Sequence, residues 1–142
     1  MSLFLPSRSG DSTSELDELK MKTVLIVEDN DLNMKLFHDL LDAHGYNTIQ
    51  TKDGMEALGL AREHMPDLIL MDVVMPDMNG FQATRQLTKG ADTAHIPIVI
   101  VTTKDQETDR VWGQRQGARD YLTKPVGDDV LRKTIDRRLA GG

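Results

Sequence analysis

The sequence has no cysteine among its 142 residues, which excludes a disulfide framework and a thiolate metal site. The same absence fits the reducing cytoplasm, where we expect the protein to work. No apolar run approaches the roughly 20 residues that a membrane-spanning helix needs, so we expect no membrane partner. The first residues also lack the basic start, long apolar stretch and cleavage site of a signal peptide.

Positive charge is scarce. Lys and Arg total 17 against 23 Asp and Glu, for a formal net charge of −6. An acidic chain gains nothing from neutralising phosphates, so we expect no nucleic acid partner. Residues 7–20 are rich in Ser, Asp and Glu, a composition that usually stays unpacked. We expect residues 1–20 to be a flexible extension or a tag, and residues 21–142 to form one domain around a single core.

Short apolar runs alternate with amphipathic stretches from Thr23 onward. Continuously apolar, β-branched runs are typical of strands buried on both faces of a parallel sheet. The expected strands are Thr23–Val27, Asn47–Thr51, Leu68–Met71, Ile98–Val101 and Asp120–Thr123. We expect the first, second and last helices to be capped by Asn30 or Asp31, by Asp53, and by Asp128 or Asp129, and the third and fourth to start near Phe81 and near Gln106. This alternation predicts an α/β fold with helices on both faces of the sheet.

The first expected helix has its leucines at helical spacing. They are Leu32, Leu36, Leu40 and Leu41, and Gly45 is expected to end the helix.

Polar side chains follow four of the five expected strands, at the sheet edge where ligands of such folds bind. They are Glu28, Asp29, Asp72, Thr102, Thr103 and Lys124, with Pro125 after the lysine. Three close carboxylates repel one another, and Mg²⁺, which prefers oxygen ligands, relieves that repulsion. An aspartate beside a cation and a lysine can attack a phosphoryl group and form an acyl phosphate.

Each of these signals is weak alone. An acidic pair can simply cap a helix, an aspartate after a strand is a common helix entry, threonines can close a strand, and Lys-Pro is a common turn. Because all of them occur together at the ends of different strands, the set favours a phosphoryl-transfer site.

Four segments resemble the receiver domain of two-component response regulators. They are Val24–Asp29, Leu70–Gly80, Val101–Thr103 and Tyr121–Pro125. The resemblance covers about residues 22–140 and implies a flavodoxin-like, doubly wound (βα)5 fold with strand order 2-1-3-4-5. It also implies a protein without enzymatic turnover, which takes a phosphoryl group from a histidine kinase or phosphotransfer protein and then controls a downstream protein target. We expect the regulator itself to act as a monomer.

The resemblance assigns roles to the residues at the strand ends. Asp72 is the implied phosphoacceptor. Asp29 is implied to bind Mg²⁺ directly, Glu28 largely through water, and Val74 through its backbone carbonyl.

It also implies roles for residues around the phosphoryl group. Thr102, followed by Thr103, supplies the switch hydroxyl, and Lys124 pairs with the phosphoryl oxygens. Tyr121 is the switch aromatic, expected to turn inward when Thr102 moves. The Lys124–Pro125 bond is implied to be cis.

Two surfaces are implied as well. Kinase docking is placed around Asn33 and Leu36 on the first helix and at Val126 after the last strand. The output surface is placed on the last two helices and the strand between them, with Tyr121 and Trp112. Trp112 is either an anchor for a partner or a residue packed on the neighbouring strand.

Within the family, residues 24–72 are similar to cell-division regulators, and residues from about 71 onward to twitching-motility regulators. Either an engineered chimera joined near the third strand or a natural relative of both groups would explain this.

Two other functions compete with the receiver. A phosphatase of the haloacid-dehalogenase type also uses a strand-end aspartate and Mg²⁺, but it needs a second aspartate two positions later, where this chain has Val74. A pseudo-receiver that has lost phosphorylation usually lacks one of the acidic pair, the acceptor or the lysine, and all of these are present.

Overall fold

The computed structural model describes residues 22–76 and 78–140, and the expected extension at residues 1–20 lies outside this part. The elements, in chain order, are β1 (Thr23–Val27), α2 (Asp31–Ala43), β2 (Asn47–Thr51), α3 (Gly54–His64), β3 (Leu68–Met71), α4 (Gly80–Lys89), β4 (Ile98–Thr102), α5 (Glu107–Arg115), β5 (Asp120–Thr123) and α6 (Asp128–Leu139). The strands form one parallel sheet in the order β2-β1-β3-β4-β5. The predicted fold class and strand order are therefore confirmed.

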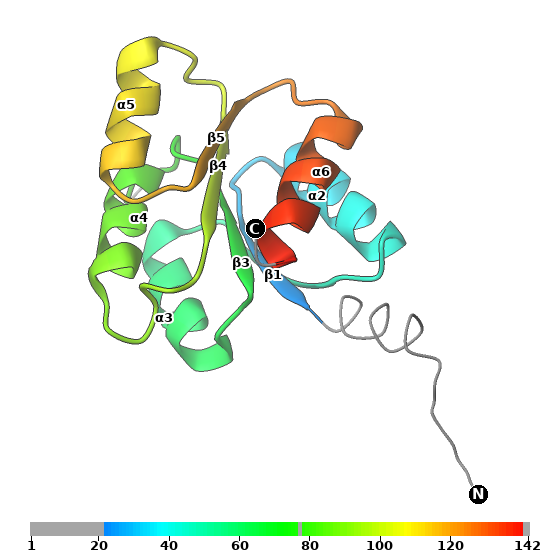
Figure 1. Ribbon diagram of the computed structural model, residues 1–142, viewed down its shortest axis with the longest axis horizontal. Coiled ribbons are helices and arrows are strands. Elements are labelled where there is room, and N and C mark those ends of the chain that lie inside the picture. The colour runs from blue at the N-terminus through cyan, green and yellow to red at the C-terminus, as the bar shows by residue number, and fades with distance from the viewer. Residues whose placement is uncertain (1–21, 77, 141–142) are drawn as a thin grey trace, which may run out of the picture.

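Helices cover both faces of the sheet, with α3, α4 and α5 on one side and α2 and α6 on the other (Figure 1). Successive residues of a strand point to opposite faces. Leu25 and Val27 of β1 accordingly pack in the core under α3 and α4, whereas Val24 and Ile26 pack in the core under α2 and α6. This two-sided burial explains why residues 24–27 of β1 and all residues of β3 are apolar.

Side-chain caps fix the starts of three helices. Asn30, Asp53 and Asn79 each accept a hydrogen bond from a backbone N–H in the first turn that follows. The cap at Asn79 starts α4 at Gly80, one residue before the expected Phe81.

The last helix starts differently from our expectation. Its N-cap is Gly127, which has no side chain to cap the helix, so the prediction of a cap at Asp128 or Asp129 was wrong. Both carboxylates lie within the first turn of α6, where negative charge is favoured by the helix dipole.

The buried face of α2 also differs from our expectation. Met34, Phe37 and Leu41 are buried, whereas Leu32 and Leu36 are 66% and 56% exposed. Leucines spaced by four fit a helix in any rotational phase, and the phase is set by packing on the sheet. Two large apolar side chains therefore remain on the surface of α2.

Within the described ranges, no helix is both long enough and apolar enough to cross a bilayer.

Candidate functional site

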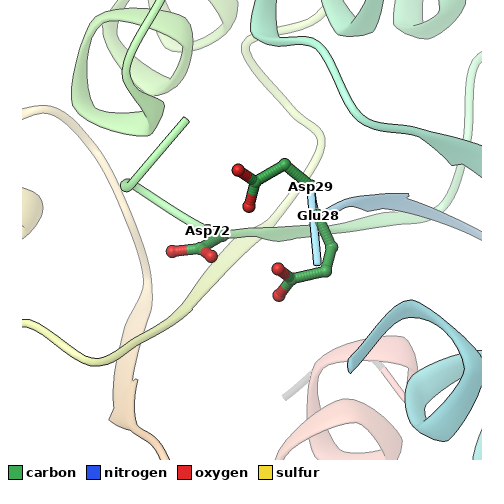
Figure 2. Close-up of side chains that lie close together, drawn as sticks. All are labelled: Glu28, Asp29 and Asp72. Atoms are coloured by element: carbon green, nitrogen blue, oxygen red, sulfur yellow. The ribbon is translucent and has the colours of Figure 1, made fainter. Parts of the chain in front are cut away.

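Three carboxylates meet at the carboxyl edge of the sheet. Glu28 and Asp29 follow β1, and Asp72 follows β3, the neighbouring strand, whose Met71 is in register with Val27. Ligand oxygens of the three side chains lie within 4.8 Å of one another, and Figure 2 shows them gathered at one point. Glu28 and Asp72 are only 1% and 6% exposed. The fold therefore concentrates negative charge where little water can screen it.

Lys124 enters this cluster from the end of β5. Its Nζ lies 2.6 Å from Glu28 Oε1 and 3.1 Å from Asp72 Oδ2. The backbone N–H of Lys124 donates to the carbonyl of Thr102 at 2.8 Å, and the Lys124–Pro125 bond is cis. The ammonium thus holds two of the three carboxylates and offsets part of their repulsion.

The pKa of Glu28 reflects the burial and the charges of this cluster. Burial raises the pKa of the Glu28 carboxyl above its usual range, and the negative charge of Asp72 raises it further. Hydrogen bonds from Lys124 and from the backbone N–H of Asn30 oppose this shift without cancelling it. Burial of the Glu28 carboxyl therefore outweighs the stabilisation that Lys124 gives to its charged form.

The donor set fits a magnesium ion. The ligand atoms are all carboxylate oxygens, as Mg²⁺ prefers, and Asp29 stays exposed, which leaves room for bound water. The backbone N–H of Val74 donates to Asp72 Oδ1 at 3.1 Å, while the Val74 side chain is exposed. The backbone of Val74 thus orients the Asp72 carboxylate, while a bond from the Val74 carbonyl to Mg²⁺ stays a prediction.

The two threonines after the core of β4 lie in different environments. Thr102 ends the strand and is fully buried, and its hydroxyl accepts a hydrogen bond from the N–H of Lys104 at 3.4 Å. Thr103 is exposed and lines a groove together with Lys124. Of the two hydroxyls, only that of Thr102 is buried in the fold.

Tyr121 is already turned inward. It is 7% exposed, and its hydroxyl donates to the carbonyl of Lys104 at 2.8 Å. The inward position that the resemblance implies for Tyr121 is thus present, and the ring fills the space under α5. Trp112, in contrast, is 48% exposed, so about half of its surface is open to a partner, and its role as an anchor stays a prediction.

The three predicted docking residues line one groove. Asn33 and Leu36 of α2 and Val126 of the β5–α6 loop border a depression of about 360 Å³ that reaches Lys124. The exposed Leu36 therefore forms part of a continuous surface that ends at the acidic cluster.

Sequence reasoning missed two contributors to the site. The Nζ of Lys124 lies over the ring of Phe37, 5.9 Å from the ring centroid. Gly80 packs so closely on the backbone after β3 that an added Cβ would lie 2.1 Å from the carbonyl oxygen of Asp72. The Asn-Gly that ends the segment Leu70–Gly80 was a signal for the glycine, whereas Phe37 reads in the sequence as an ordinary helix residue.

The comparisons with known proteins agree with this site. The response regulator receiver domain family matches residues 24–136. Protein PilH from Pseudomonas aeruginosa is 56% identical over 121 residues, which cover 85% of this chain and 100% of PilH. The polar-differentiation response regulator DivK from Brucella anthropi is 49% identical over 118 residues, 83% of this chain and 96% of DivK. Each similarity runs along the whole domain, so a junction near β3 stays a prediction.

Solved structures show the same likeness. A receiver domain of a sensor histidine kinase from Pseudomonas aeruginosa, with magnesium coordinated in its active site cleft, has a TM-score of 0.79 at 30% identity, covering 84% of this chain and 98% of that one. The chemotaxis protein CheY4 of Vibrio cholerae has a TM-score of 0.78 at 32% identity, covering 82% and 98%. With its fold, its acidic cluster and these relatives taken together, the chain belongs to the response regulator receiver domain family.

Proposed function

We propose that this protein is a phosphorylation-switched regulator that accepts a phosphoryl group on Asp72. The observation that carries the proposal is the setting of the Asp72 carboxylate, which is buried beside two other carboxylates and held by Lys124 on one oxygen and by the N–H of Val74 on the other. The proposed donor is the phosphohistidine of a kinase or phosphotransfer protein. The proposed site of action is the cytoplasm.

The reaction exchanges one bond to phosphorus for another. An oxygen of Asp72 attacks the phosphorus, the bond to the donor nitrogen breaks, and its electron pair remains on the donor imidazole. The product is an acyl phosphate on Asp72. Mg²⁺ bound at Asp29 and Asp72 would neutralise charge on the transferred oxygens.

The chain's own residues prepare this step. Glu28 orients the Lys124 ammonium through a 2.6 Å contact, so that the ammonium can pair with phosphoryl oxygens once Asp72 is phosphorylated. The Thr102 hydroxyl is proposed to donate to a phosphoryl oxygen. Val74 offers no acid to assist a leaving group, which favours a stable switch over a phosphatase with turnover.

The first prediction concerns the acceptor. With Mg²⁺ and a small acyl phosphate donor, the parent protein should gain one phosphoryl group that hydroxylamine removes, and Asp72→Asn should gain none. Intact mass and phosphate-affinity gels measure this uptake. Asp92→Asn, at an exposed position outside the cluster, is the matched control and should behave as the parent. Equal uptake by Asp72→Asn at the same site would show that another residue is the acceptor.

The second prediction concerns donor docking. The groove beside Lys124 supports a protein donor that contacts Leu36 and Val126 while it presents its phosphohistidine to Asp72. Leu36→Asp should slow phosphotransfer from a histidine phosphotransfer protein by at least about tenfold, as expected for the loss of an apolar contact at an interface. Uptake from the small donor should stay unchanged.

Leu32→Asp is the control for this experiment. Leu32 is an exposed leucine of the same helix that does not line the groove. If both variants slowed protein-dependent transfer equally, the groove would have no special role.

The output surface is proposed to lie on α5, β5 and α6. Its support is the exposed pair of Val111 and Trp112 on α5, which leaves apolar area available to a downstream protein.

A further inference from the structure

Tyr121 is held inward by contacts that do not include Asp72. The ring lies between β5, which carries it, and α5, and it belongs to the core on the α3–α4–α5 face of the sheet. Three neighbours restrain it: the backbone of Gly113, the guanidinium of Arg110 and the carbonyl of Lys104. Its inward position therefore has its own structural cause.

Gly113 provides the space for the ring. Gly113 is buried in the middle of α5, and a Cβ built there would lie 2.8 Å and 3.0 Å from two ring carbons of Tyr121 and 3.1 Å from Ile100 Cδ1. Separations this short require movement, and Ile100 is fully buried in β4. Any larger residue at position 113 thus displaces α5 or the tyrosine ring.

Arg110 closes the space from the other side. Its guanidinium carbon lies 5.4 Å from the centroid of the Tyr121 ring, within the range of a cation–π contact. Its Nη1 donates to the Tyr121 carbonyl at 3.1 Å, and its Nη2 donates to the Thr123 hydroxyl at 3.4 Å. Because the side chain is anchored on β5 at two points, it holds the ring face in place.

The tyrosine hydroxyl completes the arrangement. It donates to the Lys104 carbonyl in the β4–α5 loop, two residues after Thr102. The ring thus ties that loop to β5 through a bond that needs no phosphoryl group.

We propose that Gly113 and Arg110 are positioning residues of the switch, which keep Tyr121 inward whether or not Asp72 carries a phosphoryl group. The inference rests on the proposed function only in the sense that it concerns the switch that phosphorylation of Asp72 would operate. With the ring fixed, a change at Thr102 reaches the surface through the β4–α5 loop rather than through a rotation of Tyr121. The α5 surface with Trp112 then keeps the same support in both states.

Solvent access to the Tyr121 ring tests the proposal. The protein has two tyrosines, so ring-labelled tyrosine gives two sets of NMR signals, and the set lost in Tyr121→Phe identifies Tyr121. A soluble gadolinium chelate broadens exposed rings. In the parent, we expect Tyr121 to resist broadening to the same degree without and with Mg²⁺ and beryllofluoride. A ring that is broadened at first and becomes protected on addition of beryllofluoride would overturn the proposal.

Variants separate the two positioning residues. Gly113→Ala should expose the ring and shift its signals, whereas Gly59→Ala, on α3 with nothing within 4 Å of the added Cβ, should leave them unchanged. Arg110→Met, which removes the cation and its donors, should increase broadening, and Arg110→Lys should restore part of the protection. A protected ring in both Gly113→Ala and Arg110→Met would overturn the assignment.

Two controls keep the results interpretable. If Gly113→Ala does not fold, the parent and the Arg110 variants still decide the question. Phosphoryl uptake by Asp72 is measured on the same samples. Absence of uptake in the parent would contradict the proposed function, while the solvent-access comparison made without beryllofluoride would still test the position of Tyr121.

Discussion

Two buried threonines on the α4 side of the molecule differ in one respect that matters for stability. The hydroxyl of Thr93 donates to the Leu87 carbonyl at 2.6 Å, whereas that of Thr84, fully buried in α4, has no hydrogen-bond partner among the described residues. A buried polar group without a partner costs about 1–3 kcal/mol, and a buried hydrogen bond contributes about 1 kcal/mol.

The matched substitutions to valine should therefore diverge. Thr84→Val removes an unsatisfied hydroxyl, so the free energy of unfolding should stay the same or rise. Thr93→Val leaves the Leu87 carbonyl without its donor and should lower the free energy of unfolding by about 1 kcal/mol or more. Urea unfolding of both variants measures the difference. A larger loss in Thr84→Val than in Thr93→Val would contradict this account of the two sites.

Individual site residues were predictable from sequence where topology alone brings them together. Glu28, Asp72 and Lys124 follow parallel strands, and the carboxyl ends of parallel strands lie at one edge of the sheet whatever side chains the strands carry. Gly113 and Arg110 were not predictable in this way. Their importance depends on the rotamer of Tyr121, which packing between α5 and β5 decides.

At the scale of elements, the start of α4 is tied to Asp72, the proposed phosphoacceptor. The N–H of Gly80 donates to the Val73 carbonyl at 3.1 Å, and no side chain fits between Gly80 and the Asp72 backbone. The helix can begin this close to the strand end only because its first residue lacks a Cβ.

Gly80→Ala should therefore lower both the melting temperature and the rate of phosphoryl uptake, since α4 and the Asp72 backbone must move apart. Gly59→Ala, in open space within α3, should instead raise the free energy of unfolding by about 0.5–1 kcal/mol through helix propensity. Calorimetry and the uptake assay provide the two readouts. Normal uptake by a destabilised Gly80→Ala protein would separate the helix start from the chemistry.

The elements and their order along the chain followed from hydrophobic patterning, but the side of α2 that packs on the sheet did not. Its sequence offers two apolar stripes, one with Leu32 and Leu36 and one with Met34, Phe37 and Leu41. Contact with the sheet selects the second stripe, and a long-range packing choice of this kind leaves no local signal.

For the whole molecule, the two tyrosines set the behaviour at high pH. Burial, together with the carboxylate of Asp109, raises the pKa of Tyr121 from 10.0 to about 12. Burial also raises the pKa of Tyr46, whose hydroxyl donates to Asp136. Both phenols therefore ionise less readily in the folded chain than in the unfolded one.

This difference fixes the direction of the pH dependence. The unfolded chain releases phenolic protons first, so the stabilising contribution is complete below about pH 10 and is lost as the pH rises from 10 toward 12. The free energy of unfolding should fall over this interval, and the fall should be shallower in Tyr46→Phe. Phenolate absorbance of the native protein that rises at about pH 10 would contradict the prediction.

The division of the helices between the two faces of the sheet determines which partner proteins can bind at the same time. The groove at α2 lies on one side of the sheet, and Gly113 and Trp112 of α5 lie on the other (Figure 1). Asp72 stands at the edge between them. A donor on the first side would not compete for space with a recipient that binds α5 alone, so a transient three-protein assembly is then sterically open. A recipient that also covers α6 would overlap the groove, because Asp128 and Leu131 of α6 line it.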